Sequence, residues 1–118
     1  MQQQREIYRD IDITQLTQDA AREPDKTLEF MTLERFRAFL SRRRTKNFVA
    51  ALSIRLGKTS KELIYIDQPS NHLFVNPSIL FFFNIMECPF FAVETAHMFQ
   101  TAMGEVEKKI ETESPTLN

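Results

Sequence analysis

The sequence predicts an α+β fold: a small, mainly helical domain with a short β-hairpin. Apolar residues recur every three or four positions over residues 33–56 and again over 89–110, which is the period of amphipathic helices. Two short runs rich in β-branched and aromatic residues, 62–66 and 72–75, enclose a turn cluster at 67–71, as in a hairpin. The length of 118 residues suits a single domain.

The N-terminal third is predicted to form one strand and one short helix. Residues 1–6 are polar and glutamine-rich, so we expect a flexible N-terminus. A strand is expected near 7–14, followed by a helix over 15–21 with Thr14 as its N-cap. Residues 23–26 are expected to form a loop.

Two amphipathic helices come next. Thr32 is expected to cap a helix over 33–41, and Thr45 is expected to cap a second over 46–56 that ends at Gly57. Arg42, Arg43 and Arg44 would form the turn between them. On the second helix, the residues expected to face the core are Phe48, Val49, Leu52 and Leu56. The residues expected to face outward are Lys46, Asn47, Ala50, Ser53 and Ile54. Two such helices joined by a short turn are typical of a helix-turn-helix.

The hairpin would then lie beside this pair of helices, as a wing does. Pro77 is expected to start a central helix through Met86, and Pro89 a further helix with an apolar stripe that ends at Ile110. That stripe is expected to lie in the core, and its end is a candidate dimer contact. We expect one domain over 7–111 and a disordered tail over 112–118.

The charges are strongly segregated along the chain, although the net charge is only −1. Residues 30–61 hold nine basic side chains and one acidic side chain, Glu34, whereas residues 62–118 hold two basic and eight acidic ones. A segment this unbalanced repels itself and offers few ion pairs, so stability does not explain it. An approaching phosphate backbone is attracted by the local electrostatic field of this segment, whatever the net charge of the whole chain. The middle third therefore predicts contact with nucleic acid.

Several other classes of protein are disfavoured by the composition. The most apolar run, 79–86, is far shorter than the roughly 20 residues of a membrane span, and no signal peptide is visible, so we expect an intracellular protein without a membrane segment. One cysteine, Cys88, and two histidines do not suggest a metal site. Gly57-Lys58-Thr59 imitates the end of a P-loop, but Leu52 stands where the first glycine is needed. No catalytic arrangement has a known spacing, so we expect a protein that is not an enzyme and needs no cofactor.

Four motifs, in this order, resemble the KilA-N domain, a module of phage and large DNA virus proteins related to the fungal APSES domains. Residues 11–16, IDITQL, stand where the family has I-N-A-T-x-L, and residues 45–52, TKNFVAAL, match its t-x-x-F-I-x-A-L helix. Residues 73–77, LFVNP, stand at x-W-V-H-P, and residues 89–93, PFFAV, match S-P-x-F-A-x-x-V. The likeness covers about residues 8–100. Departures are Asp12 for asparagine, Phe74 for tryptophan and Asn76 for histidine.

The resemblance implies a winged-helix-like core that binds double-stranded DNA, in a phage or viral regulator of transcription acting in the host cytoplasm or nucleus, or in the bacterial cytoplasm. Charge and resemblance together make the helix-turn-helix at 33–61 and the hairpin wing the predicted contact. The candidate DNA-binding residues are Arg42, Arg43, Arg44, Thr45, Lys46, Asn47, Ala50, Ser53, Lys58, Lys61, Asn71 and His72. The alternative is a protein-interaction module, such as a virus–host factor, in which the same basic face meets an acidic protein partner.

Overall fold

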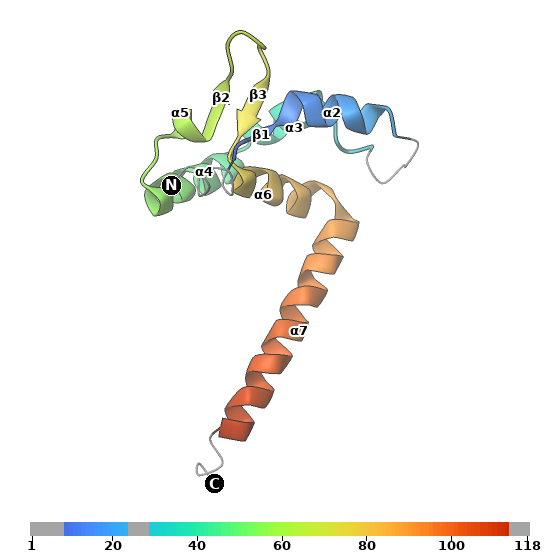
Figure 1. Cartoon of the computed structure of the whole chain (residues 1–118), viewed down its shortest axis with the longest axis vertical. Helices are drawn as coiled ribbons and strands as arrows, with labels where there is room; N and C mark the ends of the chain where they lie inside the picture. The colour runs from blue at the N-terminus through green and yellow to red at the C-terminus, as the bar shows by residue number, and fades with distance from the viewer. Residues whose placement is uncertain (1–8, 24–28, 114–118) are drawn as a thin grey trace. The chain divides into compact units, whose positions relative to one another are not determined.

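The computed structural model describes residues 9–23 and 29–113, and the expected flexible N-terminus at 1–6 lies outside them. The described residues form two compact units, unit 1 up to residue 83 and unit 2 from residue 84, whereas the sequence led us to expect one domain over 7–111. The boundary falls inside helix α6 (Pro77–Glu87), which therefore contributes to both units. In class, the described part is α+β, with six helices and a small antiparallel sheet (Figure 1).

The sheet has three short strands in the order β1-β3-β2. Strand β3 (Leu73–Val75) is central, between β1 (Ile11–Asp12) and β2 (Ile64–Ile66), and both neighbours run antiparallel to it. The β2–β3 pairing confirms the predicted hairpin. Of the strand expected near 7–14, residues 11 and 12 form β1 and residues 13 and 14 already belong to a helix, whereas residues 7 and 8 lie outside the described part.

Helix α2 (Ile13–Ala21) is capped by Asp12, so the prediction that Thr14 caps it is wrong. The Asp12 Oδ1 atom accepts a hydrogen bond from the Gln15 amide at 2.9 Å. Thr14 lies inside the first turn, and its hydroxyl oxygen instead accepts the amide of Leu73 at 3.0 Å. The helix starts two residues earlier than expected because the chain leaves the sheet at Asp12. Thr14 then ties α2 to the central strand.

Helices α3 (Leu33–Ser41) and α4 (Arg43–Leu56) form the expected pair. Thr32 caps α3, accepting the Arg35 amide at 3.1 Å, and Gly57 ends α4 in the left-handed conformation with φ of 66°; both confirm the sequence analysis. The turn between the helices is shorter than predicted, because Arg42 alone separates them and is the N-cap of α4. Thr45 is therefore not a cap: it lies in the first turn of α4 and is buried.

A short helix, α5 (Ser60–Leu63), precedes β2, where the sequence analysis expected the strand to begin at Glu62. A capping box starts it: the Thr59 hydroxyl accepts the Glu62 amide, and the Glu62 carboxylate accepts the Thr59 amide at 2.9 Å. The carboxylate stays ionised in this box, because the hydrogen bonds from Thr59 lower the pKa of Glu62. The local Thr-x-x-Glu motif thus overrides the β-propensity of the residues that follow.

Phenylalanine builds the core of unit 1. The ring of Phe36 lies 4.7 Å from that of Phe83 and 5.7 Å from that of Phe39, and all three side chains are buried. Phe48 of α4 stacks on Phe82 of α6 at 4.3 Å. These contacts hold α3, α4 and the middle of α6 together, and they fix which face of α4 remains outside.

Helix α6 begins after Asn76, which is buried and accepts the Ser78 amide through its side chain at 2.9 Å. Helix α7 (Pro89–Glu113) makes up most of unit 2 and includes residues 112 and 113, which the sequence analysis had assigned to a disordered tail. Residues 114–118 lie outside the described part. In the ranges 9–23 and 29–113, no single helix has both the length and the hydropathy of a membrane span; α6 and α7 reach that composition only when taken together across their break at Cys88.

Candidate nucleic-acid interface

The outer face of α4 carries a polar and small-residue surface. Arg43, Asn47, Ala50 and Ile54 follow one another at intervals of four, three and four residues, and all four are exposed. This spacing places them along one face of the helix. Ile54 is 85% exposed, which is high for so large an apolar side chain. The opposite face, with Thr45 and Val49 buried, packs on the core.

The first turn of α4 is suited to an anion. Arg42, its N-cap, makes no side-chain capping hydrogen bond, and the first turn contains no acidic residue. By contrast, α2, α3 and α5 are capped by Asp12, Thr32 and Thr59. The first amides of a helix have no partner within it, and its dipole favours negative charge at this end. Arg43 and Arg44, both exposed in this turn, add two full positive charges.

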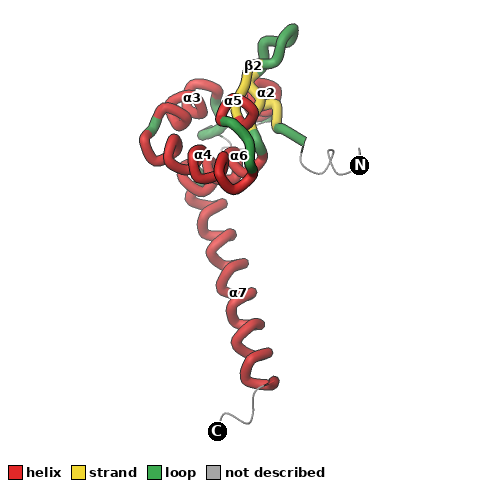
Figure 2. The backbone as a smooth tube through the Cα atoms, turned by 90° about the vertical axis from the view of Figure 1, so that its left-hand side faces the viewer, coloured by secondary structure: helices red, strands yellow, loops and turns green. Residues whose placement is uncertain are grey.

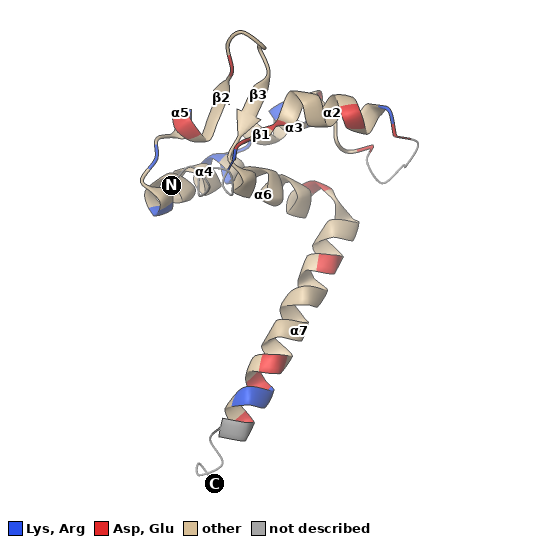
Figure 3. Ribbon diagram, in the orientation of Figure 1, with Lys and Arg blue, Asp and Glu red and all other residues tan. Residues whose placement is uncertain are grey.

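Three lysines add positive charge on α4, just after it, and on α5. Lys46 is exposed on α4, Lys58 follows the C-cap of α4, and Lys61 is exposed on α5. Figure 3 shows basic residues on α4 and on the loop that follows it, whereas the charged residue within α2 is acidic. In the described ranges, no ion pair neutralises Arg43, Arg44 or Lys46. Lys58 attracts the Glu62 carboxylate, which helps to keep the pKa of that group low.

Three residues of α4 do not lie where the sequence analysis placed them. Thr45 is 1% exposed, so its hydroxyl is not on the outer face. Ser53 is half-buried, and its hydroxyl donates to the Lys58 carbonyl, which secures the end of the helix. Leu56, expected in the core, is 44% exposed because it is the last residue of α4 and the chain turns away at Gly57.

The tip of the hairpin forms a separate region. Figures 1 and 2 both show the loop between β2 and β3 pointing away from α4. Asn71 is exposed there with φ of 60°, whereas His72 is partly buried and its Nδ1 atom lies 2.8 Å from Oδ2 of Asp12. The structure therefore places Asn71 and His72 apart from the residues of α4. The ring of His72 is already engaged by a carboxylate.

Two groups at the sheet have shifted acidities. Burial raises the pKa of Asp12, but the hydrogen bonds from Gln15 and His72 outweigh it, so the net pKa lies below the usual value. Tyr65 donates its hydroxyl proton to Oδ2 of Asp10 at 2.9 Å, and its ring stacks on Phe74. Burial, together with the adjacent Asp10 carboxylate, raises the pKa of Tyr65 to about 12. Both carboxylates serve the structure of the sheet.

An apolar groove borders the outer face of α4. It has a volume of about 560 Å³ and is lined by Leu40, Lys46, Val49, Ala50, Ser53, Ile54, Ser60 and Ile64. Four of these residues were expected to face outward: Lys46, Ala50, Ser53 and Ile54. The structure brings them together on one side of α4. The sequence analysis left Ile54 out of the candidate site. Its exposure within an otherwise amphipathic helix was the indication that it contacts something other than the core.

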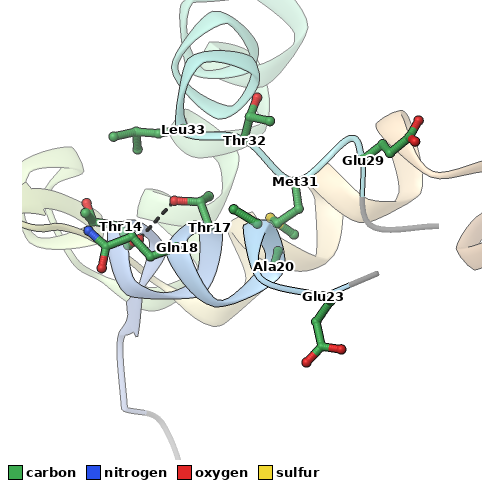
Figure 4. A pocket seen from close by; sticks show the side chains of 10 residues that line it. Thr14, Thr17, Gln18, Ala20, Glu23, Glu29, Met31, Thr32 and Leu33 are labelled. Atoms are coloured by element: carbon green, nitrogen blue, oxygen red, sulfur yellow. Dashed lines mark hydrogen bonds between the residues drawn. The ribbon is translucent and has the colours of Figure 1, made fainter. Parts of the chain in front are cut away.

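A second cavity, of about 460 Å³, lies between α2 and the segment that leads into α3. Figure 4 shows Thr14, Thr17 and Gln18 from α2 on one side and Met31 and Thr32 on the other, with the Thr17 hydroxyl donating to the Thr14 carbonyl at 2.9 Å. Its charged lining residues are Glu23 and Glu29, so it does not suit a phosphate. Among the described residues there is also no group of three or more potential metal ligands.

Searches against protein-family models, curated proteins and solved structures find no match to this chain. The KilA-N resemblance therefore rests on the four motifs quoted above. Two of the motif positions have a clear structural use here: Asp12 caps α2, and Asn76 caps α6.

Proposed function

We propose that this chain is a winged-helix-like protein that binds duplex DNA through α4. The observation that carries the proposal is the outer face of α4: a first turn without acidic residues, two exposed arginines, and Asn47 and Ala50 one and two turns farther along. A helix of 14 residues fits the major groove. Phosphates would bind at the N-terminus of α4, where the first amides have no partner within the helix and Arg43 and Arg44 are exposed.

Each residue of this face has a role that its chemistry supports. Asn47 carries the amide that pairs with the adenine edge, and Arg43 the guanidinium that pairs with guanine. Ala50 permits close approach, and the exposed methyl groups of Ile54 suit a thymine methyl. Lys58 and Lys61 contact phosphate without strict geometry. Asn71 and His72 are left out of the α4 contact, because the hairpin tip points away from that helix.

The proposal is tested by fluorescence anisotropy with duplex and single-stranded DNA over a salt series. We expect duplex binding whose logarithm falls with the logarithm of salt, with a slope of about −0.9 per phosphate neutralised. Replacing Arg43 and Arg44 by alanine should weaken binding to every sequence and flatten the slope by about one unit for each lost contact. Asn47→Ala should instead change the preference among sequences once a site has been selected.

The matched control is Arg22→Ala. It removes the same charge from an exposed side chain, but at the end of α2, far along the chain from the basic segment. Equal losses from Arg22→Ala and from the α4 variants would show a general charge effect and contradict the assignment of α4. No duplex binding at low salt would end the proposal.

A second function is supported by a different observation, the apolar groove beside α4. A groove of this volume with a lysine on its wall suits an acidic, partly apolar protein segment. Ile54→Glu would block such a segment while leaving the arginines in place. If DNA binding is absent, capture of an acidic helical peptide that is lost in Ile54→Glu would support this function.

A further inference from the structure

Helix α7 carries an apolar stripe that the fold of its own unit does not bury. Ala92, Ala96, Phe99, Met103, Val106 and Ile110 follow one another at intervals of four, three, four, three and four residues. Phe99 is 66% exposed, Met103 43%, Val106 48% and Ile110 55%. The sequence analysis expected this stripe in the core, and the structure shows that its second half is outside it.

The spacing of the stripe is informative. Steps of four and three residues alternate throughout the stripe, as the a and d positions of a two-stranded coiled coil do, and the exposure of its second half shows that this seam is not filled by its own unit. The positions next to the stripe, Gln100, Ala102, Glu107 and Lys109, are polar or small, as the margins of such a seam are. An isolated helix with Gly104 in its interior is marginal in water, so a partner helix would stabilise it.

From this spacing and the charges described next, we infer that α7 pairs with α7 of a second copy as a short antiparallel coiled coil. The inference is independent of the proposed DNA binding, because it concerns unit 2 alone.

The distribution of charge selects the antiparallel direction. Residues 95–104 contain no acidic or basic side chain apart from His97, whereas residues 105–113 contain four glutamates and two lysines. A parallel pair would place the two net negative halves side by side. An antiparallel pair places each charged half against the uncharged half of its partner, which removes that repulsion.

The same direction also pairs the stripe with itself. Aligned about the midpoint between Gly104 and Glu105, Phe99 meets Ile110 of the second copy and Met103 meets Val106. Each contact occurs twice by symmetry, so the four large side chains of the stripe are covered in four consecutive layers. A symmetric contact of this kind closes at two copies and does not propagate.

The test is the mass of the full chain in solution, measured by sedimentation equilibrium over a concentration series. We expect a reversible dimer of twice the 13.9 kDa chain mass. Val106→Lys places a charge in the middle of the seam and should yield a monomer. Thr101→Lys, on the opposite side of α7, is the matched control and should remain a dimer. Lysine is a better helix former than valine, so loss of the dimer would not reflect loss of the helix.

Direction is tested by cysteine cross-linking in a Cys88→Ser background. Ala96→Cys and Glu113→Cys together face each other across an antiparallel pair, so the double variant should form an oxidised dimer and Ala96→Cys alone should not. Cross-linking of the single variant Ala96→Cys would show a parallel pair and overturn the direction. A wild-type chain that remains a monomer up to about 1 mM, or a dimer unaffected by Val106→Lys, would overturn the inference itself.

Discussion

The carboxylate of Asp12 joins three parts of unit 1, and its removal should have a measurable cost. One oxygen caps α2 through the Gln15 amide at 2.9 Å, and the other lies 2.8 Å from Nδ1 of His72, at the end of the hairpin loop. Loss of an N-cap costs about 1 kcal/mol. A hydrogen bond to a charged group contributes about 1.5–3 kcal/mol. The side chains of His72 and Asp12 are 26% and 29% exposed, so solvent screens the bond between them. We therefore take its contribution to stability as about 1 kcal/mol.

We therefore expect Asp12→Ala to lower the free energy of unfolding by about 2 kcal/mol. Asp12→Asn should cost only about 1 kcal/mol, because asparagine caps a helix as well as aspartate does and only the charge is lost. The assay is urea unfolding followed by circular dichroism, with the midpoint shifting and the slope unchanged. A double-mutant cycle of Asp12→Asn with His72→Ala isolates the contact between the two side chains.

The stability contributed by Asp12 should also depend on pH. The pKa of Asp12 is lower in the folded protein than in the unfolded chain, so the unfolded state binds a proton first as the pH falls. The stabilisation is therefore present above about pH 4 and is lost as the pH falls through the lowered pKa. Wild type and Asp12→Asn should therefore converge in stability once the pH has fallen below that lowered pKa. Equal stabilities of wild type and both variants at pH 7, or a difference that grows in acid, would refute the reasoning.

Two further predictions concern the glycines and the sheet tyrosine. Gly57→Ala should destabilise the protein by about 1 kcal/mol, because φ at this position is 66° and alanine is strained there. Gly104→Ala should instead make α7 more stable by about 1 kcal/mol, because the added methyl group meets open space and alanine favours the helix. Thermal unfolding followed by circular dichroism measures both variants, and changes of the same sign would contradict this account. The phenol of Tyr65 should ionise near pH 12, and because its pKa is raised in the folded state, stability should decline above about pH 10 as the unfolded chain ionises first. An ultraviolet titration of wild type and Tyr65→Phe checks this, and a Tyr65 phenol that ionises near pH 10 would show that burial and Asp10 do not act on it.

Local chemistry made several elements predictable. Thr32 and Gly57 mark the beginning of α3 and the end of α4 because capping depends only on neighbouring residues. The hairpin follows from a turn cluster between two β-rich runs. The short helix α5 was missed, although the Thr59–Glu62 capping box was present in the sequence and would have located it. The segregation of basic residues into 30–61 is likewise a property of the sequence alone.

Contacts between distant residues decided the rest. Asp12, and not Thr14, caps α2 because β1 pairs with β3 some 60 residues later and leaves the sheet at that point. The burial of Thr45 follows from how α4 packs on the core, and no local rule indicates it. The apolar groove beside Ile54 needs α3, α4, α5 and β2 together. The sequence by itself determined where helices begin and where charge accumulates, because both are set within a few residues. Only the tertiary structure decided which side chains of those helices remain exposed, because exposure depends on every element that packs around them.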